Sequence, residues 1–483
     1  MHLDTVVLVL IEVLIVIGLS RLVGLGFRWI KQPLVIGEIV AGIMLGPSLF
    51  GLLAPGLAAA IFPAEAVPFL NVLSQVGLIF FMFLIGLELD PKYLKGQMEI
   101  AVITSHVSIL LPFALGTLLS LLLYPLLSDA SVSFTAFTLF LGSAMSITAF
   151  PVLARIISEQ NLQGTKLGTL ALTCAAVDDV TAWCLLALAI AVTRTNSMVG
   201  ALPTLLLSGI YITFMVTVGR KFLQRLSLYY DRRGLNQFAL AGIYMGVLAS
   251  ALITELIGIH LIFGAFLLGA IFPKNGELSH ELALKTEDFV LTFLLPVFFA
   301  YSGLRTQIGL LNTPRLWLLC AAVVAVAIIG KYVGTYFAAR VNGINKREAS
   351  ALGWLMNTRG LTELIVLNIG LSLNVISPAM FTMLVIMALV TTFMTAPLLE
   401  WVYPKNLIRK DRVEPDLSQV EPNYKILVPI ANPNTQKGLV QLAGALAFSP
   451  SDSFAVDTEE SAAGPAAAGV YPLNLIQLPA DDY

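Results

Sequence analysis

Long apolar runs alternate with short polar stretches over the first 403 residues of the chain. A helix needs about 20 mostly apolar residues to cross the roughly 30 Å hydrocarbon core of a bilayer. Thirteen runs approach this length. They are 6–20, 33–53, 72–89, 99–124, 135–157, 167–193, 200–219, 236–254, 258–272, 289–304, 315–339, 349–373 and 379–402. The pattern predicts an all-α integral membrane protein with about 13 transmembrane helices.

Basic residues are distributed unevenly between alternate loops. Loops that follow odd-numbered runs hold 17 Lys and Arg, whereas loops that follow even-numbered runs hold only Arg194, Arg305 and Arg315. Cytoplasmic loops of membrane proteins carry the excess of basic residues. This bias predicts an N-terminus outside and a C-terminus inside.

Three sequence stretches recur in the same order later in the chain. Residues 37–47 resemble 262–273, residues 81–90 resemble 297–306, and "GSAMSITAFPVL" (142–153) resembles "GWLMNTRGLTEL" (353–364). Equivalent runs are seven crossings apart, an odd number, so the two copies cross the membrane in opposite directions. Inverted repeats are typical of secondary transporters, whose binding site lies at the repeat interface near the midplane.

Composition supports the membrane assignment and excludes several classes. The chain is 57% hydrophobic and 12% charged, with a net charge of −2, so nucleic acid is not an expected partner. The three cysteines lie in apolar runs without metal-ligand spacing, which argues against a zinc site or a disulfide framework. The first run lacks a basic segment and a cleavage site, and is therefore predicted to be a span and not a signal peptide.

Asp178 and Asp179 are adjacent carboxylates inside the apolar run 167–193. Ionisable groups in hydrocarbon are costly unless they face a cavity or a partner, so they are functional candidates. A carboxyl group in such a site can hold either a proton or a metal cation, and binding of one excludes the other. The alternative is a helix cap or a polar patch that faces a neighbouring span, although Asp is unfavourable inside helices.

Lys331, in "AIIGKYVGTYFAA", is the only lysine far from the end of a run. A buried ammonium group needs an anionic partner, and one of the two aspartates is the simplest hypothesis. The alternative is that the side chain extends along the helix to the membrane interface.

Runs five and twelve contain residues that interrupt helices at equivalent repeat positions, Pro151 and Gly360. Proline lacks an N–H group, and glycine lets the backbone leave the helical conformation. Small polar residues surround both positions. We expect Ser146 and Thr148 to help the two aspartates bind the cation or proton, and Asn357 and Thr358 to support the crossing. We expect two crossed, discontinuous helices, and an ordinary proline kink is the alternative. Arg359 is expected to offset carbonyl ends at the crossing, and Glu363 to face N–H ends or pair with Arg359.

The C-terminal part differs in composition from the membrane region. We divide the chain into a membrane domain (1–403), a linker (404–423) and a short cytoplasmic tail (424–483) with β-type runs at 424–431 and 470–479. No G-x-G-x-x-G motif occurs in the tail, so a dinucleotide-gated domain is not supported.

"SITAFPVLARI", "AAVDDVTAWCLLA", Lys331 and "MNTRGLTELIVLNIG" together resemble the monovalent cation:proton antiporters. The branch with NapA-type sodium/proton antiporters and plant and cyanobacterial cation/proton exchangers is the most similar. The resemblance implies a core domain, a dimerisation domain, a homodimer and alternating access by an elevator-like movement. It also implies that Asp179 carries the cation and proton, that Asp178 pairs with Lys331, and that Thr148 lies near the ion. The start of the tail resembles the first strand of a universal-stress-protein-like domain.

We therefore expect a sodium/proton antiporter that is not an enzyme, needs no cofactor and uses Na⁺ and H⁺ as its transported ions. A potassium/proton antiporter or a potassium efflux system is the alternative, because sequence does not distinguish Na⁺ from K⁺. A passive channel and a sensor without flux are less consistent with the buried lysine and the broken helices. We expect location in a bacterial inner membrane, with a thylakoid or other internal membrane as the alternative.

Overall fold

The computed structural model describes residues 4–30, 32–63, 65–88, 98–129, 132–160, 162, 165–195, 197–230, 235–274, 277–404, 407, 426–430 and 470–474. The chain divides into two compact units, Met1–Arg412 and Val413–Tyr483. The division falls inside the expected linker 404–423, most of which lies outside the described residues.

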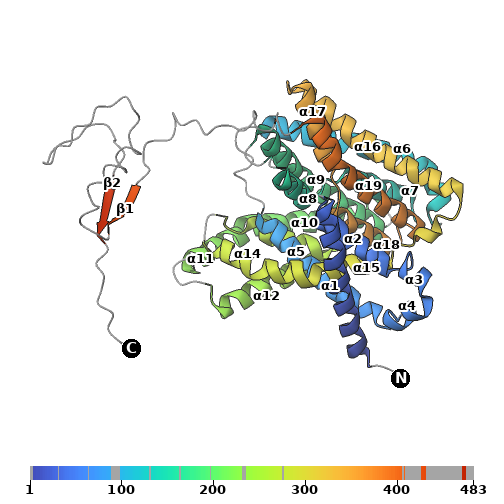
Figure 1. The fold of residues 1–483 in the computed structure, drawn as a ribbon, viewed down its shortest axis with the longest axis horizontal. Helices are drawn as coiled ribbons and strands as arrows, with labels where there is room; N and C mark the ends of the chain where they lie inside the picture. Colours follow the sequence, from blue (N-terminus) through green and yellow to red (C-terminus); the bar gives the residue numbers. More distant parts are fainter. Residues whose placement is uncertain are drawn as a thin grey trace. The chain divides into compact units, whose positions relative to one another are not determined.

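Helices form all the regular structure described in the first unit (Figure 1). They are α1 (Thr5–Trp29), α2 (Leu34–Leu45), α3 (Phe50–Leu53), α4 (Pro55–Ile61), α5 (Val67–Glu88), α6 (Met98–Leu127), α7 (Phe134–Ser146), α8 (Phe150–Glu159), α9 (Lys166–Thr195), α10 (Leu202–Phe214), the π-helix η2 (Met215–Gly219), α11 (Arg220–Tyr230), α12 (Gln237–Ile257), α13 (Leu261–Ile271), α14 (Glu277–Phe289), the π-helix η3 (Val290–Leu294), α15 (Leu295–Leu304), the 3-10 helix η4 (Ile308–Leu310), α16 (Pro314–Val341), α17 (Lys346–Met356), α18 (Leu361–Ser372) and α19 (Pro378–Val402).

The predicted membrane spans are confirmed by the helices. Eleven helical segments in the described residues are long and apolar enough to span a membrane, and two shorter apolar helices, Leu261–Ile271 and Leu361–Ser372, accompany them. Each of the thirteen apolar runs of the sequence coincides with one of these segments or contains one of the short helices. The chain is a multi-pass integral membrane protein.

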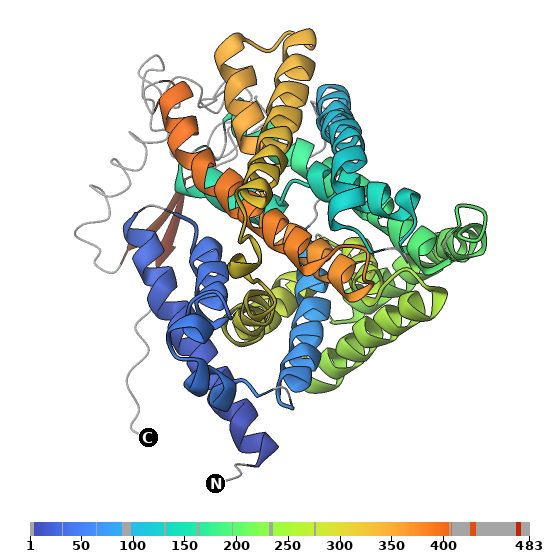
Figure 2. The same cartoon turned by 90° about the vertical axis from the view of Figure 1, so that its right-hand side faces the viewer.

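The helices of the first unit form two groups. α6, α7, α8, α9 and α16–α19 pack against one another, and α1, α2, α5 and α12–α15 form the other group. In both views the gold helices α16 and α17 lie away from the dark blue helix α1 (Figures 1 and 2). A cavity of about 300 Å³ lies where the groups meet, lined by residues of α5, α8 and α15, among others.

The inverted repeat is visible in how the second group packs. By the sequence match, α2 is equivalent to α13 and α5 to α15. In the structure α2 packs against α15, and α5 packs against α13. Each contact therefore joins a helix of one copy to a helix of the other, so neither copy can form this group alone.

Glycines permit both of these helix contacts. A Cβ atom on Gly303 would lie 1.9 Å from the carbonyl carbon of Gly42, and one on Gly269 would lie 2.2 Å from the carbonyl oxygen of Phe83. Small residues allow membrane helices to approach this closely. The backbones of α2 and α15, and of α5 and α13, are thus in direct contact.

Both predicted discontinuous helices are present, but the first break precedes Pro151. Residues 147–149 connect α7 to α8, and residues 357–360 connect α17 to α18. Pro151 lies in the first turn of α8, where its missing N–H group costs nothing. Gly360 is the N-cap residue of α18. The proline therefore starts the second half-helix and does not kink a continuous one.

The second unit contains two described strands, β1 (Ile426–Ile430) and β2 (Val470–Asn474). They pair in parallel, with Ile426 opposite Val470 and Ile430 opposite Asn474. The strands lie within the β-type runs noted in the sequence, and the rest of the tail lies outside the described residues.

Candidate functional site

Asp178 of α9 is completely buried and lies among donors from three other segments. Its Oδ2 lies 2.7 Å from Lys331 Nζ of α16, 2.8 Å from Thr148 Oγ1 and 3.3 Å from Ser108 Oγ of α6. Ser105, also on α6, donates a hydrogen bond to Oδ1. A carboxylate has about four lone-pair sites. Three of these four groups lie at Oδ2 and one at Oδ1, so both oxygens of Asp178 have hydrogen-bond partners.

Asp179 is next along α9 and lies in a different situation. Its side chain is 2% exposed, and its Oδ1 has no hydrogen-bond partner among the described residues. Adjacent positions on a helix point about 100° apart, so the two carboxylates face different surroundings. Asp179 thus retains an oxygen that is free to accept a proton or a cation.

The two helix breaks meet beside these carboxylates. The amide N–H of Ala149 donates to the carbonyl oxygen of Thr358 at 3.0 Å, which joins one break to the other. Thr148 Oγ1 lies 2.9 Å from the carbonyl oxygen of Met356 as well as near Asp178. The crossing therefore places one hydroxyl group between an acid and a carbonyl group.

The remaining polar residues of the breaks have different environments. The hydroxyl of Ser146 lies 2.6 Å from the carbonyl oxygen of Gly142 and 3.1 Å from that of Ile109, so it contacts backbone and not the acids. Asn357 and Thr358 are completely buried, and their side-chain polar atoms have no partner in the described part of the chain. These two residues are unsatisfied polar groups at the crossing.

Arg359 and Glu363 form a buried ion pair at the same crossing. Arg359 Nη1 lies 2.6 Å from Glu363 Oε2, and both side chains are completely buried. The guanidinium also donates to the carbonyl oxygens of Ala144 and Met145 at 2.8 and 2.5 Å. These carbonyls belong to the last turn of α7, where a positive charge interacts favourably with the negative end of the helix dipole.

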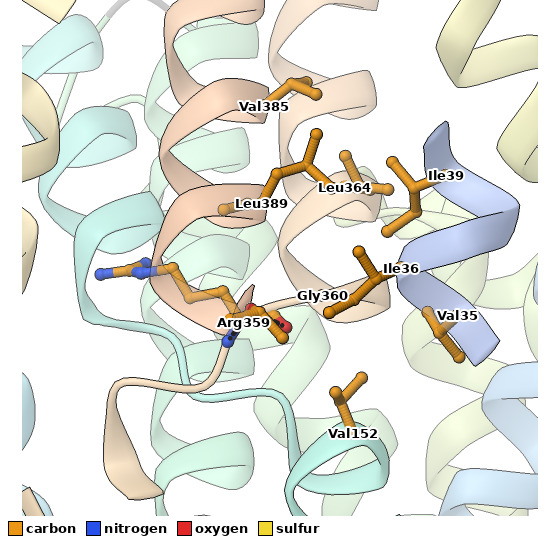
Figure 3. A pocket seen from close by; sticks show the side chains of 11 residues that line it. Val35, Ile36, Ile39, Val152, Arg359, Gly360, Leu364, Val385 and Leu389 are labelled. Carbon is orange, nitrogen blue, oxygen red and sulfur yellow. Dashed lines mark hydrogen bonds between the residues drawn. The ribbon is translucent and has the colours of Figure 1, made fainter. Parts of the chain in front are cut away.

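Figure 3 shows a small apolar pocket beside the crossing, between Ile36 of α2 and Val152 of α8. The Arg359 side chain points away from this pocket, toward α7. A Cβ atom on Gly360 would lie 2.7 Å from Val152 Cγ2, so the second break packs closely against α8. The charge of Arg359 is therefore directed into the helix end and not into the pocket.

Ser105 and Ser108 did not stand out in the sequence. They lie three residues apart in an apolar run, which is the spacing of one helix face. Buried serines usually bond to their own helix backbone, so this spacing alone does not indicate contact with a distant aspartate. Only the packing of α6 against α9 and α16 reveals that contact.

The architecture and site define a class of protein. Inverted repeats with two broken helices that cross at buried carboxylates are the arrangement of a secondary transporter for small cations.

Comparison with known proteins specifies this class further. Residues 13–401 match the family described as "Sodium/hydrogen exchanger, transmembrane", and the chain belongs to this family.

Individual relatives agree with the family assignment. The chain is 59% identical to the Na(+)/H(+) antiporter NhaS4 of Synechocystis over 84% of the chain and 99% of that protein. It is 41% identical to the Cation/H(+) antiporter 17 of Arabidopsis thaliana over 84% of the chain and 50% of that protein. It is 34% identical to the K(+)/H(+) antiporter 1 of Saccharomyces cerevisiae over 85% of the chain and 48% of that protein. The chain thus spans about half the length of these plant and yeast relatives.

The solved structure of the sodium proton antiporter MjNhaP1 from Methanocaldococcus jannaschii is similar in fold. Its TM-score is 0.62 with 14% sequence identity, covering 85% of this chain and 100% of that one. At this identity the similarity concerns the fold alone.

Proposed function

We propose that the chain is a sodium/proton antiporter in which Na⁺ and H⁺ compete for Asp179. The observation that carries the proposal is the contrast between the neighbouring acids. Both oxygens of Asp178 accept hydrogen bonds, whereas Asp179 is equally buried and keeps an oxygen without a partner among the described residues. The 59% identical Synechocystis relative is named as a Na(+)/H(+) antiporter, which supports Na⁺ as the cation.

The exchange requires no covalent chemistry. Burial makes a bare negative charge on Asp179 unfavourable, so the site is stable only when it holds a proton or a cation. Thr148, Asn357 and Thr358 provide neutral oxygens at the crossing that can replace part of the cation's water shell. Entry of the cation would separate Lys331 from Asp178. Alternating access would then release the cation on the other side of the membrane.

Several features of the whole molecule belong to the same proposal. We place the N-terminus outside and the C-terminus inside, on the basis of the Lys and Arg distribution. We expect a homodimer in a bacterial plasma or thylakoid membrane, and a cytoplasmic tail after the linker 404–423. The similarity to a cyanobacterial protein supports such a membrane.

Exchange of K⁺ for H⁺ is the second candidate, because one relative is named as a K(+)/H(+) antiporter. Both cations are bound by oxygen atoms, and they differ in size and in the cost of dehydration. A comparison of Na⁺, K⁺ and Li⁺ in the same proteoliposomes decides between them. Exchange of Na⁺ in preference to K⁺ supports the first proposal, and the reverse order supports the second.

Substitution of the central acid tests the proposed function itself. In proteoliposomes with an imposed pH gradient, Asp179→Asn is expected to abolish the cation-dependent fluorescence dequenching of a pH-sensitive dye. Asp288→Asn is the matched control, because it makes the same chemical change at an exposed residue of α14, away from the site. Full exchange by Asp179→Asn would show that the carrier assignment is wrong.

A further inference from the structure

Polar side chains join α18 to the end of α15. Asn368 of α18 is buried, and its amide nitrogen donates hydrogen bonds to Ser302 Oγ at 2.7 Å and to the carbonyl oxygen of Leu364 at 2.9 Å. Arg305, directly after α15, donates to Asn368 Oδ1 at 3.4 Å and to Ser372 Oγ at 3.1 Å. Both amide hydrogens and the amide oxygen of Asn368 are therefore used. We call the four side chains Ser302, Arg305, Asn368 and Ser372 the polar seam.

The spacing of these residues produces the polar seam. Asn368 and Ser372 are four positions apart on α18, and Ser302 and Arg305 are three positions apart at the end of α15, so each pair lies on one helix face. Arg305 also lies over the ring of Tyr301, with its Cζ 5.1 Å from the ring centroid. This cation–π contact orients the guanidinium toward α18 before it donates to Asn368.

The polar seam connects the two groups of helices at one end of the membrane unit. α18 belongs to the first group and α15 to the second. Both helices lead to loops that follow even-numbered runs, which are the loops that we assign to the outside. On the same side Arg194 of α9 pairs with Glu255 of α12 at 2.6 Å, and this ion pair also joins the two groups. Polar side chains therefore hold the outer ends of the two groups together.

The equivalent place in the other repeat copy contains a cavity. By the sequence match, α5 is equivalent to α15 and α8 to α18. α5 and α8 lead to inner loops and line the cavity of about 300 Å³, with Glu88 and Arg155 on its wall. The inner ends still touch elsewhere, because Gln32 donates to the carbonyl oxygen of Phe393 at 3.3 Å. Equivalent helix pairs thus have two arrangements, one closed by hydrogen bonds and one separated by a cavity.

Two such arrangements are what alternating access requires. In transporters built from inverted repeats, one bundle of helices moves against the other around a fixed site, so that one side opens as the other closes. Opening of the outer side would separate α18 from α15 and break the hydrogen bonds of the polar seam. Water can replace hydrogen bonds of this kind, so their net contribution to the closed state is modest. The polar seam can therefore hold the outer side closed and still open during transport.

We propose that the polar seam is the outer gate of the transporter, closed while the cavity between α5 and α8 is open. The inference rests on the proposed antiport function and identifies the contacts that hold one of its two states. Asn368 is a positioning residue in this gate, because it contacts α15 and not the aspartates that we assign to the cation.

Covalent bridging of the polar seam is the first test. Arg305→Cys/Ser372→Cys is prepared in a chain whose three native cysteines are replaced by serine, and is bridged with a bis-methanethiosulfonate as long as an arginine side chain. Exchange in proteoliposomes should be lost on bridging and should return on reduction. Tyr244→Cys/Thr286→Cys is the matched control, because these hydroxyl groups lie 2.9 Å apart on α12 and α14, within one group. Bridging of the control should leave exchange unchanged.

Asn368→Ala tests the gate without a cross-link. Loss of the amide weakens the closed gate and populates the outward-open state, so the apparent Na⁺ affinity from the outer side should rise about fivefold. The affinity from the inner side should change by less than about twofold, because the inward-open state is still well populated. Right-side-out and everted membrane vesicles give the two values. Asn342→Ala is the control, because Asn342 donates to Ala338 of its own helix.

The outcomes separate the gate from the proposed function. A purely structural role of Asn368 would lower the rate from both sides and leave the ratio of the two affinities unchanged. Full exchange by the bridged protein, or an unchanged ratio in Asn368→Ala, would overturn the gate. If Asn368→Ala does not fold, Arg305→Gln should raise the outer affinity, and an unchanged ratio would again overturn the gate. Failure of the wild type to exchange cations for protons, or full exchange by Asp179→Asn, would instead overturn the antiport proposal.

Discussion

The hydroxyl group of Thr148 has one hydrogen and two acceptors within reach. Asp178 Oδ2 lies 2.8 Å away and the carbonyl oxygen of Met356 lies 2.9 Å away. A hydroxyl group donates once and accepts twice. When its hydrogen points to Met356, the oxygen can stabilise a cation beside the acids. In the antiporter that we propose, Thr148 therefore serves both the empty and the loaded site.

Replacement of this hydroxyl group should weaken cation binding. Thr148→Val keeps the shape and removes the oxygen, and we expect the KM for Na⁺ to rise about tenfold, since a hydrogen bond to a charged group contributes roughly 1.5 kcal/mol. Thr148→Ser should remain close to wild type. Thr391→Val is the control, because the Thr391 hydroxyl donates to its own helix. Equal KM values for Thr148→Val and wild type would contradict the prediction.

At the scale of elements, the two broken helices, α7–α8 and α17–α18, meet at the buried Arg359–Glu363 ion pair. The last turn of α7 ends in the membrane with carbonyl groups that Arg359 satisfies, and Glu363 neutralises Arg359. Loss of one partner from a buried ion pair leaves an uncompensated charge, whereas loss of both can be nearly neutral. The pair is therefore expected to act as a unit in stability.

Thermal unfolding of the purified protein tests this dependence. Arg359→Met should lower stability by about 3–5 kcal/mol, and Arg359→Met/Glu363→Leu should recover part of the loss. Arg155→Met disrupts an ion pair of the same spacing in which both side chains are more than a third exposed, and should cost less than about 1 kcal/mol. A double variant as unstable as Arg359→Met would assign the stability to the α7 carbonyl contacts instead.

Most of the membrane-spanning elements could be predicted from the sequence. The membrane spans, the inverted repeat and both helix breaks follow from apolar length and from proline and glycine positions, because these are local properties. The sequence placed the first break at Pro151, whereas the structure has it at residues 147–149, because proline is tolerated in the first turn of α8. Sequence alone did not show that the breaks are joined by a hydrogen bond between Ala149 and Thr358.

At the scale of the whole molecule, contact between the two repeat copies stabilises one group of helices. α2 and α15 cross with Gly42 against Gly303, so any side chain at that point forces the helices apart. Overpacking of a tight contact typically costs about 1–3 kcal/mol and occasionally more. The crossing is consequently a sensitive point of the membrane unit.

Gly303→Ala should therefore reduce the midpoint of thermal unfolding and the yield of monodisperse protein in detergent. A Cβ atom on Gly209, in α10, would meet no atom within 4 Å, so Gly209→Ala is the matched control. That change should be neutral or slightly stabilising, because alanine favours helix by about 1 kcal/mol over glycine. Equal stability of the two variants would show that the α2–α15 contact adapts to a larger residue.

The sequence by itself determined the membrane class, the number of spans, the inverted repeat and the two acids with their lysine. These features follow from hydrocarbon thickness and from the cost of burying charge, which act on every short stretch of chain. The tertiary structure decided which acid accepts hydrogen bonds at both oxygens and which has an oxygen without a partner among the described residues, and it brought Ser105 and Ser108 to the ion pair. Those contacts join residues 70 to 223 positions apart, and only helix packing sets such distances.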